Sequence, residues 1–179
     1  SHTHAVKGHP KQGPHLRLSQ IGCGGSGAFL GIHVTRLARE CLRLFDTVTV
    51  SFYDGDTIEE KNLRRQNFCA AEVGQNKAEG LAFRLSTAWG IPIRAYSRHF
   101  SEKEFQSEYD TLTILLGCVD TTKARRSLHK ALAHGNARND SQTWLIDGGN
   151  LTTHGQVLIG NVVTDFNPQQ SFLLGNVCQ

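Results

Sequence analysis

The sequence predicts an α/β fold: a Rossmann-like, doubly wound, mostly parallel sheet with helices on both faces. Two observations carry this prediction. Segments typical of buried strands alternate along the chain with segments of helical periodicity. The first strand segment also runs directly into a glycine-rich loop, Gly22-x-Gly24-Gly25-x-Gly27, which opens the first helix.

Composition limits the classes of protein to which the chain can belong. Its 179 residues suffice for one domain with its own core, and apolar and charged fractions of 39% and 20% are ordinary for a globular protein. No run of about 18 apolar residues and no signal segment occur, so we expect no membrane span and no export. A scattered net charge of +3 predicts no nucleic-acid partner. Five cysteines without a C-x-x-C pair favour a reducing cytoplasm and no structural zinc.

We divide the chain into a polar leader, residues 1–15, and an α/β domain, residues 16–179. The leader is rich in Gly, Pro, His and Lys, a composition typical of chain ends. The last stretch, TDFNPQQSFLLGNVCQ, does not continue the pattern of strands and helices. We therefore expect the domain to be truncated or discontinuous near its C-terminal end.

The first half of the domain predicts a βαβ unit, a second helix and a third strand. LRLSQIGC (16–23) is typical of a buried strand, and TVTVSFYD (47–54) is a β-branched and aromatic one. Between them a helix is predicted over about residues 26–44. A further helix is predicted over about 76–89, and a strand over 93–100. The first of these helices is indicated by apolar residues at helical spacing: Phe29, Ile32, Leu37, Cys41 and Leu44.

The second half continues the alternation. SEKEFQSEY (101–109) predicts a short helix whose start resembles a capping box. TLTILLGCVD (111–120) is a continuous apolar run that ends in an acid, as expected of a central parallel strand. A helix is predicted over 122–134, and two strands follow, TWLIDGG (143–149) and GQVLIGNVV (155–163).

The glycine loop is a candidate phosphate site. Backbone N–H groups can approach a phosphate closely only where no Cβ intervenes, and the N-terminus of the following helix attracts negative charge. A tight turn that binds nothing is the alternative. Asp54 ends the second strand, where an acid commonly binds ribose hydroxyls, and both NAD and ATP carry a ribose.

Cationic and amide side chains beside the loop favour ATP over a redox dinucleotide. A triphosphate and its pyrophosphate leaving group need positive charge and amide donors at fixed positions. Asn62, Arg65, Gln66 and Lys77 supply these groups shortly after the second strand. We interpret their charged neighbours as a solvated surface: Glu59, Glu60, Lys61 and Arg64.

Asp120 ends the predicted central strand. Ligands of open α/β sheets bind just outside the carboxyl ends of the strands, so a carboxylate there can hold Mg²⁺ against phosphates. Its alternative role is to cap the helix that starts at Thr121-Thr122, and the two roles are compatible.

Four ordered motifs resemble the ThiF/MoeB superfamily of ubiquitin-activating-type adenylating enzymes: the glycine loop, YDGDTIEEKNLRRQNF, VGQNKAE and GCVD. The family signature D-x-D-x-V-x-x-x-N-L-x-R-Q is met with Ile58 in place of Val, and V-G-x-x-K follows. WLIDGGNLTTHGQVLIG (144–160) looks most like ThiF-family members of bacterial PRTRC gene systems or of bacterial ubiquitin-like operons. The resemblance covers about residues 16–165.

The resemblance implies a role for each site residue. The loop of Gly22, Gly24, Gly25 and Gly27 would cradle ATP, with Asp54 on the ribose and with Asp56 and Asn62 shaping the phosphate side. Arg65, Gln66 and Lys77 would contact the phosphates, and Asp120 would hold Mg²⁺. The implied catalytic residues are Arg65, Lys77 and Asp120.

The implied reaction is adenylation of the C-terminal glycine carboxylate of a ubiquitin-like protein, with release of pyrophosphate. This step would begin a conjugation or a sulfur transfer in a cytoplasmic bacterial protein that forms a homodimer. Relatives often borrow an arginine from the dimer partner, and Arg17 is the candidate here.

The sequence departs from many relatives because the paired C-x-x-C zinc ligands are absent. A thioester step would need a cysteine. We interpret Cys118 as a core residue of the central strand, which leaves Cys69 and Cys178 as candidates without supporting context. Two other functions stay open, an NAD(P)-dependent oxidoreductase and a non-catalytic module that binds a ubiquitin-like protein.

Overall fold

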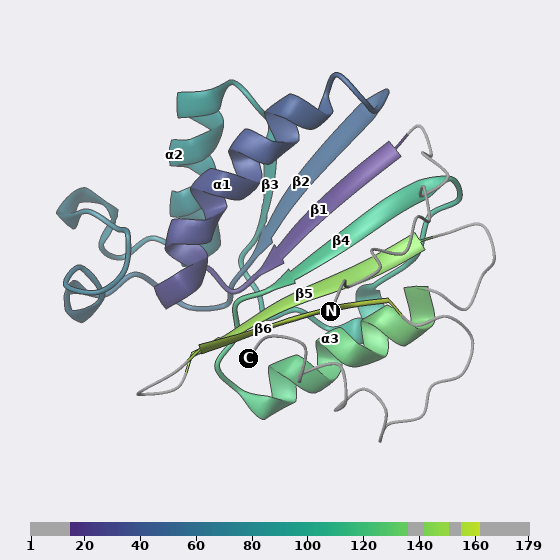
Figure 1. Cartoon of the computed structure of the whole chain (residues 1–179). Coiled ribbons are helices and arrows are strands. Elements are labelled where there is room, and N and C mark those ends of the chain that lie inside the picture. The colour runs from purple at the N-terminus through teal and green to yellow at the C-terminus, as the bar shows by residue number, and fades with distance from the viewer. Residues whose placement is uncertain (1–14, 136–141, 151–154, 162–179) are drawn as a thin grey trace, which may run out of the picture.

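In the residues that the structure describes, six strands form one sheet (Figure 1). The structure is a computed structural model, and it describes residues 15–135, 142–150 and 155–161. In chain order the strands are β1 (His15–Ile21), β2 (Thr47–Tyr53), β3 (Ile93–Tyr96), β4 (Thr111–Gly117), β5 (Gln142–Asn150) and β6 (Gly155–Gly160).

The strand order is β3-β2-β1-β4-β5-β6. The first five strands run parallel, and β6 pairs antiparallel with β5. The described strands therefore start with β1 at the centre of the sheet, continue outward through β2 and β3, and return to the other side of β1 with β4. This reversal between β1 and β4 is where ligands of doubly wound sheets bind, outside the carboxyl ends of the strands.

Helices cover both faces of the sheet, as the sequence predicts (Figure 1). On one face α1 (Gly25–Cys41) and α2 (Lys77–Trp89) pack with β1 and β2 around a core that includes Leu18, Phe52 and Leu81. On the other face α3 (Thr122–Gly135) packs through Leu128 on β4 and β5. The Rossmann-like, doubly wound prediction is confirmed.

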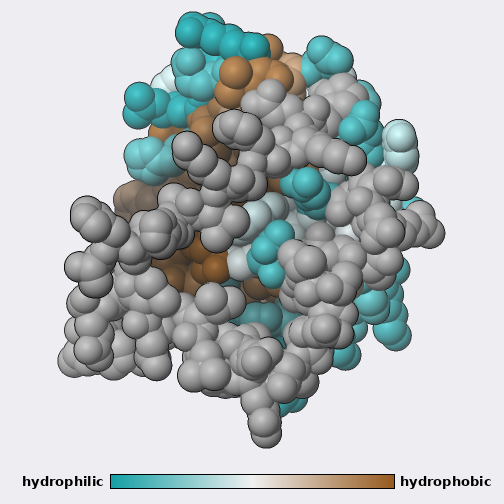
Figure 2. Space-filling view, turned by 45° about the vertical axis from the view of Figure 1, so that its right-hand side comes forward, coloured by the Kyte–Doolittle hydropathy of each residue, from teal (hydrophilic) through white to brown (hydrophobic). Residues whose placement is uncertain are grey.

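Helix α1 is shorter than predicted, and it buries a different face from the one that its apolar spacing indicates. It buries small residues, because Gly31 approaches α2 so closely that a Cβ there would lie 3.0 Å from Leu81 Cδ2. Phe29 and Leu37 are instead 53% and 49% exposed, and Leu44, 65% exposed, lies beyond the end of the helix. Figure 2 shows apolar surface at the top of the molecule, the end at which α1 terminates in Figure 1.

Two predicted elements are shorter in the structure. The strand predicted over 93–100 ends at Tyr96, and in the segment predicted as a helix only η3 (Glu102–Glu104) forms, as a 3-10 turn. Ser101 starts this turn by accepting a hydrogen bond from the Lys103 N–H at 3.4 Å. Phe105 then adopts an extended backbone and packs against the α3 core, and this tertiary contact ends the turn.

The remaining boundaries agree with the sequence to within three residues, with 162–163 of the last strand outside the described part of the chain. The polar leader, apart from His15 in β1, and the C-terminal stretch also lie outside the described residues, so both remain predictions. No described helix is both long and apolar enough to cross a membrane.

Candidate functional site

The glycine loop joins β1 to α1 and takes its shape from close backbone contacts. Gly22 has φ +95°, and a Cβ there would lie 2.5 Å from the Cys118 carbonyl oxygen. A Cβ on Gly27 would lie 2.1 Å from the Gly22 carbonyl oxygen. These two glycines are needed for the turn itself. Gly24 and Gly25 have room, and no side chain caps the start of α1, which leaves this helix end open to an anion.

Gln20 supports the loop from below, a role that the sequence did not reveal. This residue is fully buried in β1, and its Nε2 donates to the carbonyl oxygens of Gly27 at 2.9 Å and Gly22 at 3.1 Å. A buried amide bonded to both ends of a turn fixes the distance between them. Gln20 therefore holds the loop in one conformation.

Asp54 links the end of β2 to the glycine loop by hydrogen bonds. Its Oδ2 accepts the Cys23 N–H at 2.7 Å, and its Oδ1 accepts the Asp56 N–H at 2.9 Å. Burial raises the pKa of Asp54, and the two backbone hydrogen bonds oppose this effect. A carboxylate oxygen accepts more than one hydrogen bond, so Asp54 can still accept one from a hydroxyl group of a ligand.

Asp56 and Lys77 form an ion pair beside Asp54. The Lys77 Nζ lies 3.0 Å from Asp56 Oδ2, and the Lys77 side chain is only 9% exposed. Asn76 caps α2 by accepting the Ala78 N–H at 2.9 Å, and its Nδ2 donates to the Asp54 and Asp56 carbonyl oxygens. The V-G-x-N-K segment thus places Lys77 beside Asp54 and Asp56. An ammonium has three N–H donors, so Lys77 can bind a further acceptor besides Asp56.

Asn62, Arg65 and Gln66 follow in and after the short turn η1 (Glu60–Asn62). Asn62 is buried and its Oδ1 accepts the Glu59 N–H at 2.9 Å, so it holds the turn in shape. Gln66 is 7% exposed, lies beside Gly24, and its Oε1 has no hydrogen-bond partner among the described residues. Arg65 is exposed, and no described residue forms an ion pair or hydrogen bond with its guanidinium.

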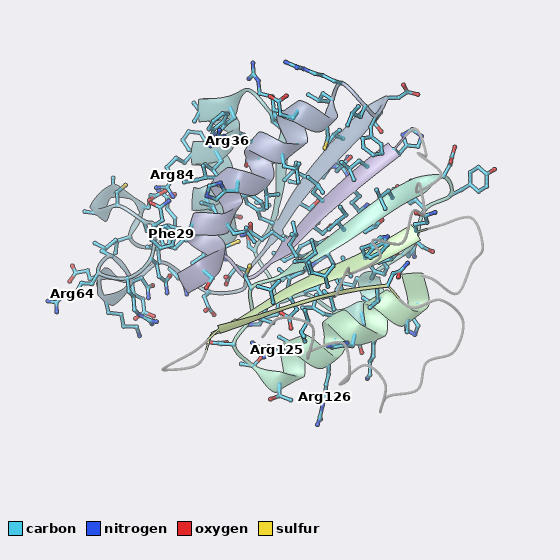
Figure 3. The ribbon with its side chains drawn as sticks, viewed as in Figure 1. Phe29, Arg36, Arg64, Arg84, Arg125 and Arg126 are labelled. Carbon is cyan, nitrogen blue, oxygen red and sulfur yellow. The ribbon has the colours of Figure 1, made fainter. Side chains whose placement is uncertain are left out.

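The charged neighbours of these residues divide into two groups. Arg64 points away from the molecule in Figure 3, as expected of a solvated residue. Lys61 and Glu59 are exposed and paired with each other at 2.8 Å, but they also line the cleft described below.

The turn after β4 carries Asp120. The strand ends at Gly117, three residues earlier than predicted, and Asp120 is exposed. Thr121 caps α3, because its Oγ1 accepts the Ala124 N–H at 3.2 Å, so Asp120 does not have this role. Cys118 lies outside the strand and lines the cleft, contrary to our interpretation of it as a strand residue. Burial raises the pKa of Cys118 to about 12, which keeps the thiol protonated at neutral pH.

The other cysteine candidates gain little support. Cys69 is exposed and precedes η2 (Ala70–Glu72), where its N–H donates to Glu72 Oε2 at 2.7 Å. Cys178 lies outside the described residues. Arg17, the candidate for the borrowed arginine, pairs with Glu108 and donates to the Gln106 carbonyl oxygen in its own chain.

These segments meet around a cleft of about 880 Å³ at the carboxyl ends of β1, β2 and β4. Every predicted site residue except Gly27 lines it, so the structure brings together residues that are up to about a hundred positions apart: Gly22, Gly24, Gly25, Asp54, Asp56, Asn62, Arg65, Gln66, Lys77 and Asp120. The lining residues that the sequence reasoning missed include His99, Phe100, Arg125, Ser127 and Gly148.

Asp147 is a buried acid next to this cleft that the sequence reasoning also missed. It lies near the end of β5, is 3% exposed, and its Oδ2 is 3.6 Å from the Arg125 Nε. Burial raises the pKa of Asp147, and the charges of Arg125 and His129 lower it in part. An acid near the carboxyl end of a strand was a usable signal, the same one that singled out Asp54 and Asp120.

Several solved structures share this fold. E. coli MccB with AMPCPP and MccA aligns with TM-score 0.62 and 16% identity over 86% of this chain and 43% of that one. PaaA aligns with TM-score 0.58 and 14% identity over 92% and 54% of the two chains. E. coli TcdA, a tRNA N6-threonylcarbamoyladenosine dehydratase in complex with AMP, aligns with TM-score 0.51 and 16% identity over 75% and 51%.

This chain therefore spans about half the length of each of these proteins, and at such identities the likeness shows the fold alone. No curated protein sequence matches the chain significantly. The model of the ThiF family matches residues 15–172, which is most of the sequence, and the chain belongs to the ThiF family.

Proposed function

We propose that this domain binds ATP and Mg²⁺ and adenylates a substrate carboxylate, as ThiF/MoeB-type enzymes do. The observation that carries the proposal is that one cleft gathers an open helix N-terminus, Asp54 at the end of β2, the cations Arg65 and Lys77, and Asp120. Among the structures that share the fold, MccB is bound to ATP in one and TcdA to AMP in another, which supports a nucleotide at this place.

The chain's own residues suit the two halves of a nucleotide. Asp54 would accept the ribose hydroxyls, and the Gly24–Gly25 backbone at the start of α1 would hold phosphate oxygens. Arg65, which has no partner among the described residues, and Lys77 would neutralise charge on the outer phosphates. Gln66 is buried beside Gly24 with its Oε1 unpaired, and its side-chain amide would contact the phosphates from that side.

The donor set at Asp120 fits a magnesium ion that is shared with phosphates. The described residues contain no cluster of three or more His, Cys, Asp or Glu side chains that could hold a metal on its own. Mg²⁺ commonly binds one or two carboxylates plus substrate phosphates, and Asp120 offers one exposed carboxylate in the cleft. When bound, the ion would offset the charge that develops on the leaving pyrophosphate.

The chemistry needs no general base. A carboxylate substrate is ionised at neutral pH, and its oxygen attacks the α-phosphorus of ATP. The new O–P bond forms an acyl-adenylate, and the bond to the β-phosphate oxygen breaks, so pyrophosphate leaves with the electron pair. The protein would contribute position and charge neutralisation, and Arg65 and Lys77, which both line the cleft, would supply the positive charge.

We further propose that the carboxylate belongs to the C-terminal glycine of a ubiquitin-like protein and that the whole protein works as a homodimer in a bacterial cytoplasm. The PRTRC-like appearance of residues 144–160 supports this choice. Transfer to a conjugation target or to sulfur would follow the adenylate. Of the two alternatives, an oxidoreductase gives no role to Arg65, Lys77 and Asp120, and a binding module would not need them.

Calorimetric titration with ATP, with and without Mg²⁺, and separately with NADH, tests the nucleotide. We expect magnesium-dependent ATP binding and no NADH binding; NADH binding alone would contradict the proposal. Pyrophosphate exchange in the presence of a candidate ubiquitin-like protein then tests the reaction. Exchange with the intact C-terminal glycine and none after its removal is expected, and ATP binding without any exchange would favour the binding module.

A further inference from the structure

An ion pair on the α3 side of the cleft is not used by the chemistry above: Asp147 is buried, and Arg125 is half-buried. Arg125 comes from the first turn of α3, and its guanidinium reaches the end of the sheet, where Asp147 lies. Arg125 lies between α3 and the sheet in Figure 3, whereas the next residue, Arg126, points away from the molecule.

The backbone around this pair leaves room for it. A Cβ on Gly117, at the end of β4, would lie 2.5 Å from Asp147 Oδ1. A Cβ on Gly149, in β5, would lie 2.8 Å from an Arg125 terminal nitrogen. Side chains at either glycine would displace one partner of the pair.

The pair contributes little to stability in itself. The Arg125 Nε and Asp147 Oδ2 are 3.6 Å apart, beyond hydrogen-bond distance, and neither the Nε nor Asp147 Oδ1 has a hydrogen-bond partner in the described part of the chain. Buried ion pairs are often no more stabilising than apolar residues of similar volume, because desolvation offsets the attraction. Stability alone therefore gives little reason for this pair.

What an apolar pair could not do is donate to the turn that carries Asp120. A terminal nitrogen of the Arg125 side chain donates to the Val119 carbonyl oxygen at 3.3 Å. The backbone N–H of the same residue donates to the Thr121 carbonyl oxygen at 3.1 Å, a helical bond that any residue at this position would form. The guanidinium therefore holds the backbone on the Val119 side of Asp120, and the first turn of α3 holds the Thr121 side. The Asp120 side chain itself has no hydrogen bond or ion pair to a described residue, so its position depends on this backbone.

We infer that Arg125, held by Asp147, is a positioning residue that sets the place of the Asp120 carboxylate in the cleft. The inference rests on the proposed function, since it concerns where Asp120 meets the metal and outer phosphates of bound ATP. Its consequence is specific: loss of the pair weakens the magnesium-dependent part of ATP binding and leaves AMP, which has no outer phosphates, nearly unaffected.

Two variants test the inference in the full chain, with ATP, Mg²⁺ and AMP as probes in calorimetry. Arg125→Gln removes the guanidinium, and Gly149→Ala keeps both charges but pushes the guanidinium aside through its Cβ. The matched control is Arg126→Gln, which removes an exposed arginine from the adjacent position. For both test variants we expect Mg·ATP to bind about tenfold more weakly, the gain in ATP affinity on adding Mg²⁺ to shrink, and the AMP affinity to change by less than about twofold.

Three results would overturn the inference while leaving the proposed function intact. Equal losses for ATP and AMP would mean a general loosening of the cleft, and wild-type ATP affinity in both variants would mean that the pair has no effect on Asp120. A loss confined to Arg125→Gln would show that the guanidinium contacts the ligand directly. If wild type and Arg126→Gln both fail to bind Mg·ATP, the proposed function itself is wrong, and the inference falls with it.

Discussion

The β2 side and the β4 side of the cleft are held in different ways. On the β2 side Asp54 accepts two backbone hydrogen bonds, and Asn76 bonds both the Asp54 and Asp56 carbonyl oxygens. On the β4 side Asp120 is exposed, and the ion pair beneath its turn leaves polar atoms of Arg125 and Asp147 without partners among the described residues. The backbone that carries Asp54 and Asp56 is thus fixed by hydrogen bonds within the protein, whereas the Asp120 carboxylate has no bond to a described residue.

This difference separates groups whose loss should affect folding from groups whose loss should affect only the bound state. Replacing a residue whose polar atoms are all hydrogen-bonded within the protein lowers the free energy of unfolding, because its partners lose their bonds. A residue without protein partners contributes mainly through the ligand. Three substitutions, given from the largest expected effect to the smallest, test this division.

Asp120→Ala should have the largest effect on activity. Removing the single exposed carboxylate of the turn is expected to lower pyrophosphate exchange by about 10³-fold, the scale of losing a preorganised electrostatic group. The melting temperature should stay within about 2 °C of wild type, because Thr121 and not Asp120 caps α3. Exchange at the wild-type rate would refute the magnesium role, and a large drop in melting temperature would place Asp120 with the structural side.

Asp54→Asn should differ from Asp120→Ala by lowering the stability of the fold. An amide cannot accept both backbone N–H groups that Asp54 holds, so one of them loses its partner. We expect the free energy of unfolding to fall by about 1–3 kcal/mol, measured by urea denaturation. Unchanged stability would show that the β2 side is not preorganised as its hydrogen bonds indicate.

Lys77→Ala removes a residue with features of both sides and should have the smallest effect. The lysine belongs to the rigid side through Asp56, but that carboxylate is 57% exposed and is readily solvated when its partner is lost. ATP affinity should therefore fall by about tenfold, the scale of one charge-assisted contact, with AMP affinity nearly unchanged. Equal losses for both nucleotides in calorimetry would exclude a contact with the outer phosphates.

The same division explains how far the sequence could predict the molecule. The β2 side is encoded in the short run from Asp54 to Lys77, where spacing alone brings the residues to one strand end, and each predicted residue there lines the cleft. The strand order follows from the alternation of strands and helices, which has few solutions.

What the sequence did not reveal depends on contacts between distant segments. Gln20 resembles any strand residue until its bonds to Gly22 and Gly27 are seen. Arg125 and Asp147 are separated by a helix and a strand, and only the pairing of β4 with β5 brings them together. Phe29 and Leu37 have the spacing of a buried face. The close approach of Gly31 to Leu81 nevertheless requires small residues on the face of α1 that packs against α2.

Gly25 offers a way to measure the site from within. A Cβ there would meet no protein atom within 4 Å, although the position opens α1 at the cleft. Ala, Ser and Val at this position would therefore form a graded series of lengths that only a bound molecule can sense. The side-chain size at which nucleotide affinity begins to fall would report how closely a phosphate approaches the backbone at Gly25.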